Sequence, residues 1–211
     1  MLFGSISYLN LLPFQLFLKR YINSNASKMA FRYNRAVPSA INQALKSKRV
    51  NAAFISSITS KKAKCTDLGI IAKGSVYSVF AIPNESGEDP ASATSNHLAK
   101  ILGIDGRILI GDKALKYYLD GGVGIDLALQ WQQRTNLPFV FARLCYNRHS
   151  CYIKKLAKEF KKSHIKIPQY ILKKEAKKRG ITPKQLEWYL KHIHYDIDYK
   201  AQRGLKRFLR S

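Results

Sequence analysis

Stretches with strand character alternate with amphipathic helical stretches along most of this 211-residue chain. Near the N-terminus, buried-strand patterns at residues 2–7, 29–33 and 52–55 are separated by helical patterns at 11–21 and 38–48. Strands that alternate with helices in this way are typical of an α/β protein with a parallel sheet. We therefore expect an α/β fold from the first residues onward.

The alternation continues toward the C-terminus, where helical patterns dominate. The remaining expected strands cover residues 68–72, 76–82, 107–110 and 139–144, and the remaining expected helices cover 95–102, 112–119, 126–134, 151–162, 168–179, 183–194 and 201–209. Residues 84–92 are polar, contain Gly and Pro, and are expected to form a loop.

Positive charge is the most unusual feature of the composition. The chain carries 37 Lys and Arg against 13 Asp and Glu, a net charge of +24. Residues 145–211 hold 19 of the cations but only 5 of the acids. A ligand or partner is therefore expected to be anionic. The hydrophobic content of 46% can supply a real core, which excludes a chain that is disordered as a whole.

The cysteines and the N-terminal residues indicate the compartment. Cys65, Cys145 and Cys151 cannot all pair with one another, and their spacing matches no metal-ligand pattern. We expect free thiols in a reducing compartment, with a cytoplasmic location. Asn10 and Pro13 interrupt an N-terminal apolar stretch that has no basic leader, so we expect neither a signal peptide nor a membrane anchor.

Polar residues follow two of the expected N-terminal strands. Asn10 lies in the turn after the first strand, and Ser56 and Ser57 come directly after the strand at 52–55. In open α/β sheets, ligands bind at the carboxyl ends of the strands. These side chains are therefore expected to meet at one edge of the sheet.

Several short motifs follow one another along the chain in a specific order and spacing. They are SYLNLLP at 7–13, ISSI at 55–58, SVYSV at 75–79, ATS at 93–95, IGDKAL at 110–115, DLALQW at 126–131, TNLPFVFA at 135–142, and WYL at 188–190 followed by Tyr195, Gly204, Leu205 and Phe208. Together they resemble the chorismate dehydratase family of the futalosine pathway of menaquinone biosynthesis, the MqnA family.

The resemblance implies an α/β, two-lobed fold of the periplasmic-binding-protein type (type II) with a central cleft. Residues 1–78 and 145–211 would form the first lobe. Residues 79–144 would form a smaller second lobe, in which the segment at 83–92 is shorter than the family pattern. The implied activity is that of a hydro-lyase, a carbon-oxygen lyase that converts chorismate to 3-[(1-carboxyvinyl)oxy]benzoate and water without a cofactor or a metal.

Removal of the ring proton in this reaction pushes negative charge into the ring carboxylate, so donors are needed there. Asn10 and Ser78 match the family's substrate-contacting positions, and we expect both to be catalytic. The further residues expected to bind the substrate are Ser56, Ser57, Thr94, Ser95 and Asp112.

The base for the proton abstraction has two candidates. One is the enolpyruvyl carboxylate of the substrate itself, held in place by Asn10, and the other is Asp112. Asn10 and Asp112 also suit helix N-caps, and Asp126 is expected to cap the helix that follows it.

Three other functions compete with the dehydratase. A non-catalytic solute-binding protein would share the fold, and the later naphthoate-forming enzyme of the same pathway is a relative in fold. A basic nucleic-acid-binding protein would use aromatic residues between the lysines of the tail, and its binding would weaken with salt. We expect chorismate as the small anionic partner, and neither nucleic acid nor a membrane; no oligomeric state is predicted.

Overall fold

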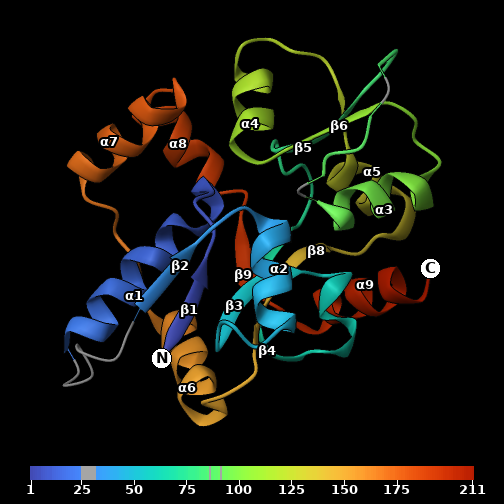
Figure 1. Cartoon of the computed structure of the whole chain (residues 1–211). Coiled ribbons are helices and arrows are strands. Elements are labelled where there is room, and N and C mark those ends of the chain that lie inside the picture. The colour runs from blue at the N-terminus through green and yellow to red at the C-terminus, as the bar shows by residue number, and fades with distance from the viewer. Residues whose placement is uncertain (25–31, 86, 91) are drawn as a thin grey trace.

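The computed structural model describes residues 1–24, 32–85, 87–90 and 92–211 as two β-sheets with their covering helices (Figure 1). Within this part of the chain, the larger sheet has six strands in the order β2-β1-β3-β8-β4-β9, and the smaller has three in the order β6-β5-β7. The expected two-lobed α/β architecture is confirmed.

The strands are β1 (Leu2–Ser5), β2 (Arg32–Arg35), β3 (Ala52–Ser56), β4 (Lys64–Ala72), β5 (Val79–Ile82), β6 (Arg107–Ile110), β7 (Ile125–Asp126), β8 (Phe139–Tyr146) and β9 (His194–Asp196). The α-helices are α1 (Leu12–Ser24), α2 (Pro38–Lys46), α3 (Ala93–Leu102), α4 (Gly111–Leu119), α5 (Leu127–Thr135), α6 (Ser150–Lys162), α7 (Gln169–Arg179), α8 (Pro183–Leu190) and α9 (Tyr199–Arg210), and the 3₁₀ helices are η1 (Leu9–Leu11) and η3 (Thr59–Lys62).

The larger sheet is mixed rather than parallel. Strand β1 pairs in parallel with β2 and β3, as the alternating pattern predicts. The other pairings, β3 with β8, β8 with β4, and β4 with β9, are antiparallel. The expectation of a parallel sheet was therefore wrong beyond β1, because β8 returns from the smaller sheet and enters between β3 and β4.

Side-chain caps start some of the helices, and α8 has the fullest of them. The Thr182 hydroxyl accepts a hydrogen bond from the Gln185 N–H, and the Gln185 side chain accepts one from Thr182 N–H, which starts α8. The helix expected at 183–194 ends at Leu190, and β9 follows it. Residues 29–31 of the strand expected at 29–33 lie outside the described residues, and β2 begins at Arg32.

Aromatic side chains form the core of the larger lobe. The Phe14 ring of α1 lies edge-on to Phe54 of β3 at 4.9 Å and to Phe160 of α6 at 5.2 Å between centroids. On β8, the Phe139 ring contacts Phe208 of α9 at 4.9 Å. Helices from the beginning and the end of the chain are thereby packed onto one sheet.

Asp126 attaches α5 to the crossover between the sheets, the segment at 73–78 that connects β4 to β5. One carboxylate oxygen accepts the Ala128 and Leu129 N–H groups at 3.0 and 3.1 Å, so the expected helix cap is confirmed. The other oxygen accepts the N–H groups of Val76 and Tyr77, both at 2.9 Å. Burial raises the pKa of the Asp126 carboxyl, although the four backbone hydrogen bonds act to lower it.

The return from the smaller sheet to the larger one occurs before β8. Strand β8 spans eight residues, Phe139–Tyr146. It pairs with β4 along its length, from Phe139 opposite Ala72 to Tyr146 opposite Lys64. The lobe boundary expected after Leu144 therefore falls inside a strand of the larger sheet.

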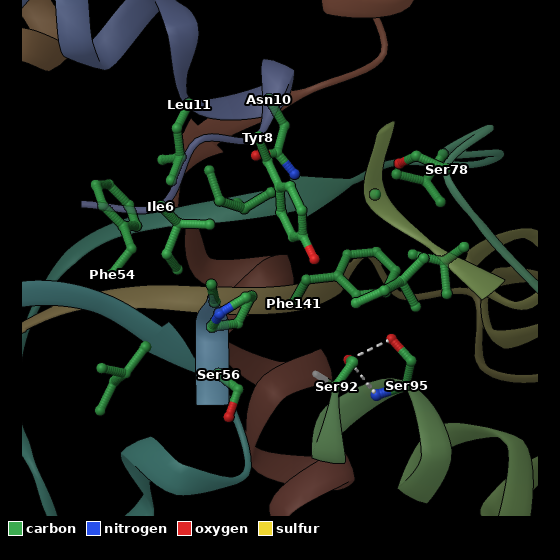
Figure 2. Close-up of a pocket in the computed structure, with 18 residues that line it drawn as sticks. Ile6, Tyr8, Asn10, Leu11, Phe54, Ser56, Ser78, Ser92, Ser95 and Phe141 are labelled. Atoms are coloured by element: carbon green, nitrogen blue, oxygen red, sulfur yellow. Dashed lines mark hydrogen bonds between the residues drawn. The ribbon is translucent and has the colours of Figure 1, made fainter. Parts of the chain in front are cut away.

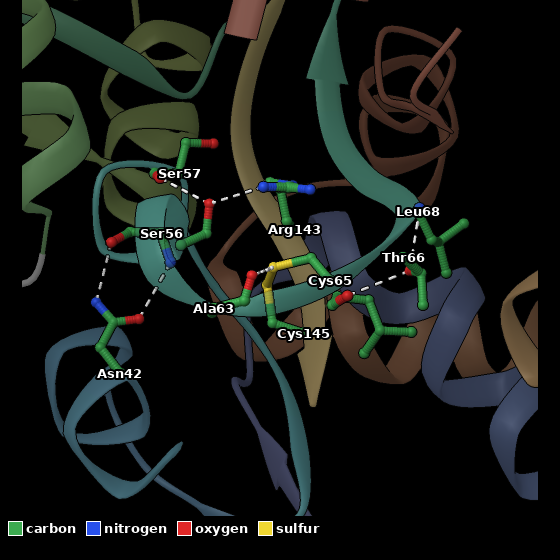
Figure 3. Close-up of a disulfide and its surroundings, with 11 residues drawn as sticks. Asn42, Ser56, Ser57, Ala63, Cys65, Thr66, Leu68, Arg143 and Cys145 are labelled. Carbon is green, nitrogen blue, oxygen red and sulfur yellow. Dashed lines mark hydrogen bonds between the residues drawn. A yellow bond between two sulfur atoms is a disulfide. The ribbon is translucent and has the colours of Figure 1, made fainter. Parts of the chain in front are cut away.

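Cys65 and Cys145 form a disulfide between the neighbouring strands β4 and β8 (Figure 3). The two residues lie directly opposite each other in the register of this antiparallel pair, 80 residues apart in sequence. The expectation of three free thiols was wrong for these two, because the pairing of β4 with β8 was not predicted. Cys151 is free and exposed.

Reduction of this disulfide is expected to lower the free energy of unfolding by about 3 kcal/mol, because it closes a long loop in the unfolded chain. Urea denaturation with and without a reductant measures the change. Alkylation of the unreduced, denatured protein should modify Cys151 alone, and the variant Cys151→Ser should unfold like the original protein. Labelling of all three cysteines before reduction would contradict the disulfide.

The variant Asp126→Ala is expected to lose about 3 kcal/mol of stability, because four backbone N–H groups lose their acceptor. Urea denaturation of this variant measures the loss. Asp105→Ala is the matched control, since the Asp105 side chain is exposed, and a change within about 0.5 kcal/mol is expected for it. Equal denaturation midpoints for the two variants would contradict the role given to Asp126.

Candidate active site

A pocket lies between the two sheets and takes its lining from both (Figure 2). Including its open mouth, it holds about 660 Å³ free of protein atoms. The lining comes from η1, the carboxyl ends of β3 and β4, β8, the crossover, the β6–α4 junction and the start of α3. Its polar residues are Tyr8, Asn10, Ser56, Ser78, Ser92 and Ser95.

Asn10 lines the pocket from η1, as expected. Leu9 and Leu11 on either side are buried in the core, which fixes the turn and leaves the Asn10 side chain directed toward the pocket (Figure 2). The Asn10 carbonyl oxygen accepts a hydrogen bond of 2.7 Å from the Tyr195 hydroxyl. Asn10 lies within η1 and does not cap α1, so its side chain is available to a ligand.

Ser78 also lines the pocket, from the crossover. Its backbone carbonyl accepts the Gly111 N–H at 2.8 Å, which ties the crossover to the start of α4. Its hydroxyl oxygen accepts a hydrogen bond of 3.0 Å from the hydroxyl of Tyr189. The preceding residue, Tyr77, has a φ of 58°, and the Asp126 carboxylate holds its N–H group in this turn.

Ser56 and Ser95 also line the pocket, as expected, from β3 and α3. The Asn42 amide donates to the Ser56 hydroxyl oxygen at 3.1 Å and accepts the Ser56 N–H at 3.1 Å (Figure 3). Ser92 donates to the Ser95 hydroxyl oxygen at 2.8 Å and caps α3 by accepting the Ser95 N–H. The amino end of α3 therefore faces the pocket and favours a negative charge there.

Ser57 and Thr94 are buried near the pocket but do not line it. The Ser57 hydroxyl donates to the Val140 carbonyl oxygen at 2.5 Å, and the Thr94 hydroxyl accepts the Ile58 N–H at 3.2 Å. Both were expected to bind the substrate. In the structure their hydroxyls instead hold neighbouring backbone, because Ser57 after β3 bonds to β8 and Thr94 in the first turn of α3 bonds to Ile58.

Asp112 lies behind the pocket wall rather than in it. One carboxylate oxygen accepts the Leu9 N–H at 2.9 Å, and the other accepts from Arg179 of α7 at 2.9 Å. Burial raises the pKa of the Asp112 carboxyl, while the bonds with Leu9 and Arg179 act to lower it. The side chain neither caps α4 nor reaches the pocket, so its expected contact with substrate is not found. It connects α4 to η1 and α7.

Tyr8 is a pocket residue that the motif analysis did not single out. Its ring lies against Gly111, where an added Cβ would come within 2.9 Å of the ring. Burial raises the pKa of the Tyr8 phenol to about 12, and the charges of Asp89 and Asp112 act in the same direction. The phenol therefore stays protonated and can donate a hydrogen bond. Tyr8 belongs to the SYLNLLP motif at 7–13, and this was the sequence signal that could have identified it as a pocket residue.

The lining combines apolar walls with neutral polar groups. Phe54, Phe141, Ile70 and Val79 supply flat and branched apolar surface. Among the described residues that line it, none is a Lys, Arg, His, Asp or Glu. Such a pocket suits a planar, unsaturated ring whose carboxylates are held by hydroxyl, amide and backbone N–H groups.

The part of the chain that the structure describes holds neither a metal-binding cluster nor a helix that could span a membrane. No cluster of three or more His, Cys, Asp or Glu side chains is placed to hold a metal ion there. No helix in those residues has the length and apolar character needed to cross a membrane.

Comparison with known proteins identifies the family. A family model described as menaquinone biosynthesis matches residues 97–211. The chain is 47% identical over 217 residues to the chorismate dehydratase of Campylobacter jejuni subsp. jejuni serotype O:23/36, covering 100% of this chain and 97% of that protein. It is 28% identical to the chorismate dehydratase of Thermus thermophilus, with 97% and 92% of the two chains covered.

Solved structures share the fold at low sequence identity. A protein of Archaeoglobus fulgidus superposes with a TM-score of 0.71 at 11% identity, covering 99% of this chain and 95% of that one. The periplasmic aliphatic sulphonate binding protein of Escherichia coli superposes with a TM-score of 0.56 at 12% identity, covering 100% and 85%. The fold is thus periplasmic-binding-protein-like, and the full-length identity shows that this chain belongs to the menaquinone biosynthesis family.

Proposed function

We propose that this protein is a chorismate dehydratase that converts chorismate to 3-[(1-carboxyvinyl)oxy]benzoate and water. The observation that carries the proposal is the pocket between the sheets, where Asn10 from η1 and Ser78 from the crossover both line a largely apolar cavity. The 47% identity with the dehydratase of Campylobacter jejuni, over the full length of this chain, supports the choice of substrate. Binding of an aromatic-like dicarboxylate is consistent with this pocket and with the similarity to that dehydratase.

The reaction breaks the C–H bond of the ring carbon that carries the enolpyruvyl ether. It also breaks the C–O bond of the hydroxyl on the neighbouring ring carbon. The electron pair of the C–H bond moves through the ring diene toward the ring carboxylate and then expels hydroxide, which takes up the abstracted proton and leaves as water. Donors directed at the ring carboxylate stabilise this charge as it develops. We assign this task to the Ser78 and Ser95 hydroxyls and to N–H groups at the start of α3.

We propose that the enolpyruvyl carboxylate of the substrate takes the proton. That carboxylate can reach the ring C–H through a six-membered arrangement, so the base is already placed beside the proton. A neighbouring cation would lower the pKa of the carboxylate and weaken it as a base, and the pocket lining contains no Lys or Arg. Asn10 would orient the carboxylate through a neutral amide donor.

Asp112, the rival base, is better explained as a support for η1. Both of its carboxylate oxygens are engaged, by the Leu9 N–H and by Arg179. The Tyr8 phenol is the ionisable lining group, and its pKa of about 12 makes it a donor at neutral pH. These contacts favour the substrate-assisted route.

We further propose that the pocket is the cleft between two lobes. The first lobe comprises residues 1–78 together with the chain from β8 onward, and the second comprises the residues between them. This places the return crossover at residues 136–138 instead of after Leu144, because β8 pairs with β3 and β4. A cytoplasmic location, chorismate as the partner, and the absence of a nucleic-acid partner stay predictions.

Asn10→Ala and Ser78→Ala are expected to lower kcat for chorismate by about 100-fold, because each removes a donor that acts on developing or transferring charge. Product formation followed by chromatography measures the rate. Circular dichroism and thermal unfolding check that each variant folds.

Asp112→Asn distinguishes the two bases. We expect it to keep turnover within about tenfold of the original protein, since the amide oxygen can still accept the Leu9 N–H. A variant that folds and binds chorismate but forms no product would overturn the substrate-assisted route. Absence of any turnover by the unaltered, folded protein would instead favour the solute-binding function.

A further inference from the structure

Tyr189 stands behind Ser78 and does not line the pocket. The residue lies near the end of α8 and is 1% exposed. Its hydroxyl donates a buried hydrogen bond of 3.0 Å to the Ser78 hydroxyl oxygen across 111 residues of sequence. The contact joins a helix of the C-terminal third to the crossover between the sheets.

This hydrogen bond determines which way the Ser78 hydroxyl can act. A serine hydroxyl has one hydrogen to donate and two lone pairs to accept. Because Tyr189 occupies a lone pair on the protein side, the hydrogen of Ser78 is directed away from Tyr189, and the open side of Ser78 is the pocket. Ser78 is thereby set as a donor.

The phenol is well suited to a fixed donor role. Burial raises the pKa of Tyr189 far above neutral pH, although the hydrogen bond with the Ser78 side chain acts to lower it. The proton therefore stays on Tyr189 throughout the physiological range.

The neighbourhood of Tyr189 holds the contact in place. Adjacent Trp188 packs its ring against Tyr77, the residue before Ser78, with centroids 4.6 Å apart. Leu186 of the same helix is fully buried. Helix α8 and the crossover are therefore packed as one unit, and the hydroxyl of Tyr189 has little freedom to turn elsewhere.

We propose that Tyr189 is a positioning residue that orients the Ser78 hydroxyl to donate its hydrogen to a carboxylate of the ligand in the pocket. The assignment rests on the proposed function for the identity of that ligand. As charge develops on the ring carboxylate, the donor aligned by Tyr189 binds it more strongly, so the effect falls on kcat more than on KM.

A double-mutant cycle tests whether Tyr189 acts through Ser78. The four proteins are the original chain, Tyr189→Phe, Ser78→Ala and the double variant, and kcat, KM and the Kd of chorismate are measured for each. Tyr189→Phe keeps the ring in its space and is expected to lower kcat about tenfold with KM changed less than threefold. In the Ser78→Ala background, the same change is expected to alter kcat less than twofold.

Tyr152→Phe is the matched control. The Tyr152 hydroxyl is also buried in the C-terminal third but has no hydrogen-bond partner within the described part of the protein, so its loss should leave kcat unchanged. Thermal unfolding of all variants separates a loss of folding from a loss of orientation.

Two results would overturn the assignment: an unchanged kcat in Tyr189→Phe, or equal losses from Tyr189→Phe with and without Ser78. If the original protein binds chorismate without converting it, the proposed function fails, and the cycle is read from Kd instead. Non-additive changes in Kd would then support the orienting role of Tyr189, and additive changes would contradict it.

Discussion

The Asp126 carboxylate is the interaction on which the arrangement of the pocket depends. It gathers four backbone N–H groups, two from the first turn of α5 and two from the crossover at Val76 and Tyr77. A buried carboxylate is costly unless such donors surround it, and here they belong to segments 50 residues apart. The crossover is therefore held in a turn that delivers Ser78 to the pocket.

A second carboxylate connects the two sides of the site in another way. Asp112 on α4 binds the backbone of η1 and the guanidinium of Arg179, so the turn that carries Asn10 is attached to the smaller lobe. The tyrosines behind the pocket complete this support, because Tyr195 holds the Asn10 carbonyl and Tyr189 holds the Ser78 hydroxyl. Groups that do not line the cavity thus hold both residues assigned to catalysis.

The strong positive charge of the chain and the neutrality of the pocket have separate effects. The net charge of +24 attracts an anionic substrate over a long range, and this attraction weakens with salt. At short range, hydroxyl and amide donors bind carboxylates without forming an ion pair. A carboxylate held in this way keeps more of its basicity than one paired with Lys or Arg, which suits a substrate that supplies its own base.

The sequence by itself determined most of the order of helices and strands, because capping residues and apolar periodicity are local signals, but it missed the short strands β7 and β9. Asp126 shows this well, since its position before a helical pattern was enough to predict a cap that the structure contains. The motif resemblance also predicted the family and the pocket positions of Asn10, Ser56, Ser78 and Ser95.

Only the tertiary structure decided which distant segments meet. The insertion of β8 between β3 and β4 made the sheet mixed and brought Cys65 opposite Cys145. The packing of α7 and α8 against the pocket engaged Asp112 with Arg179 and placed Tyr189 behind Ser78. These pairs are far apart in sequence, and no local pattern specifies them, because they arise when distant segments of the chain pack side by side.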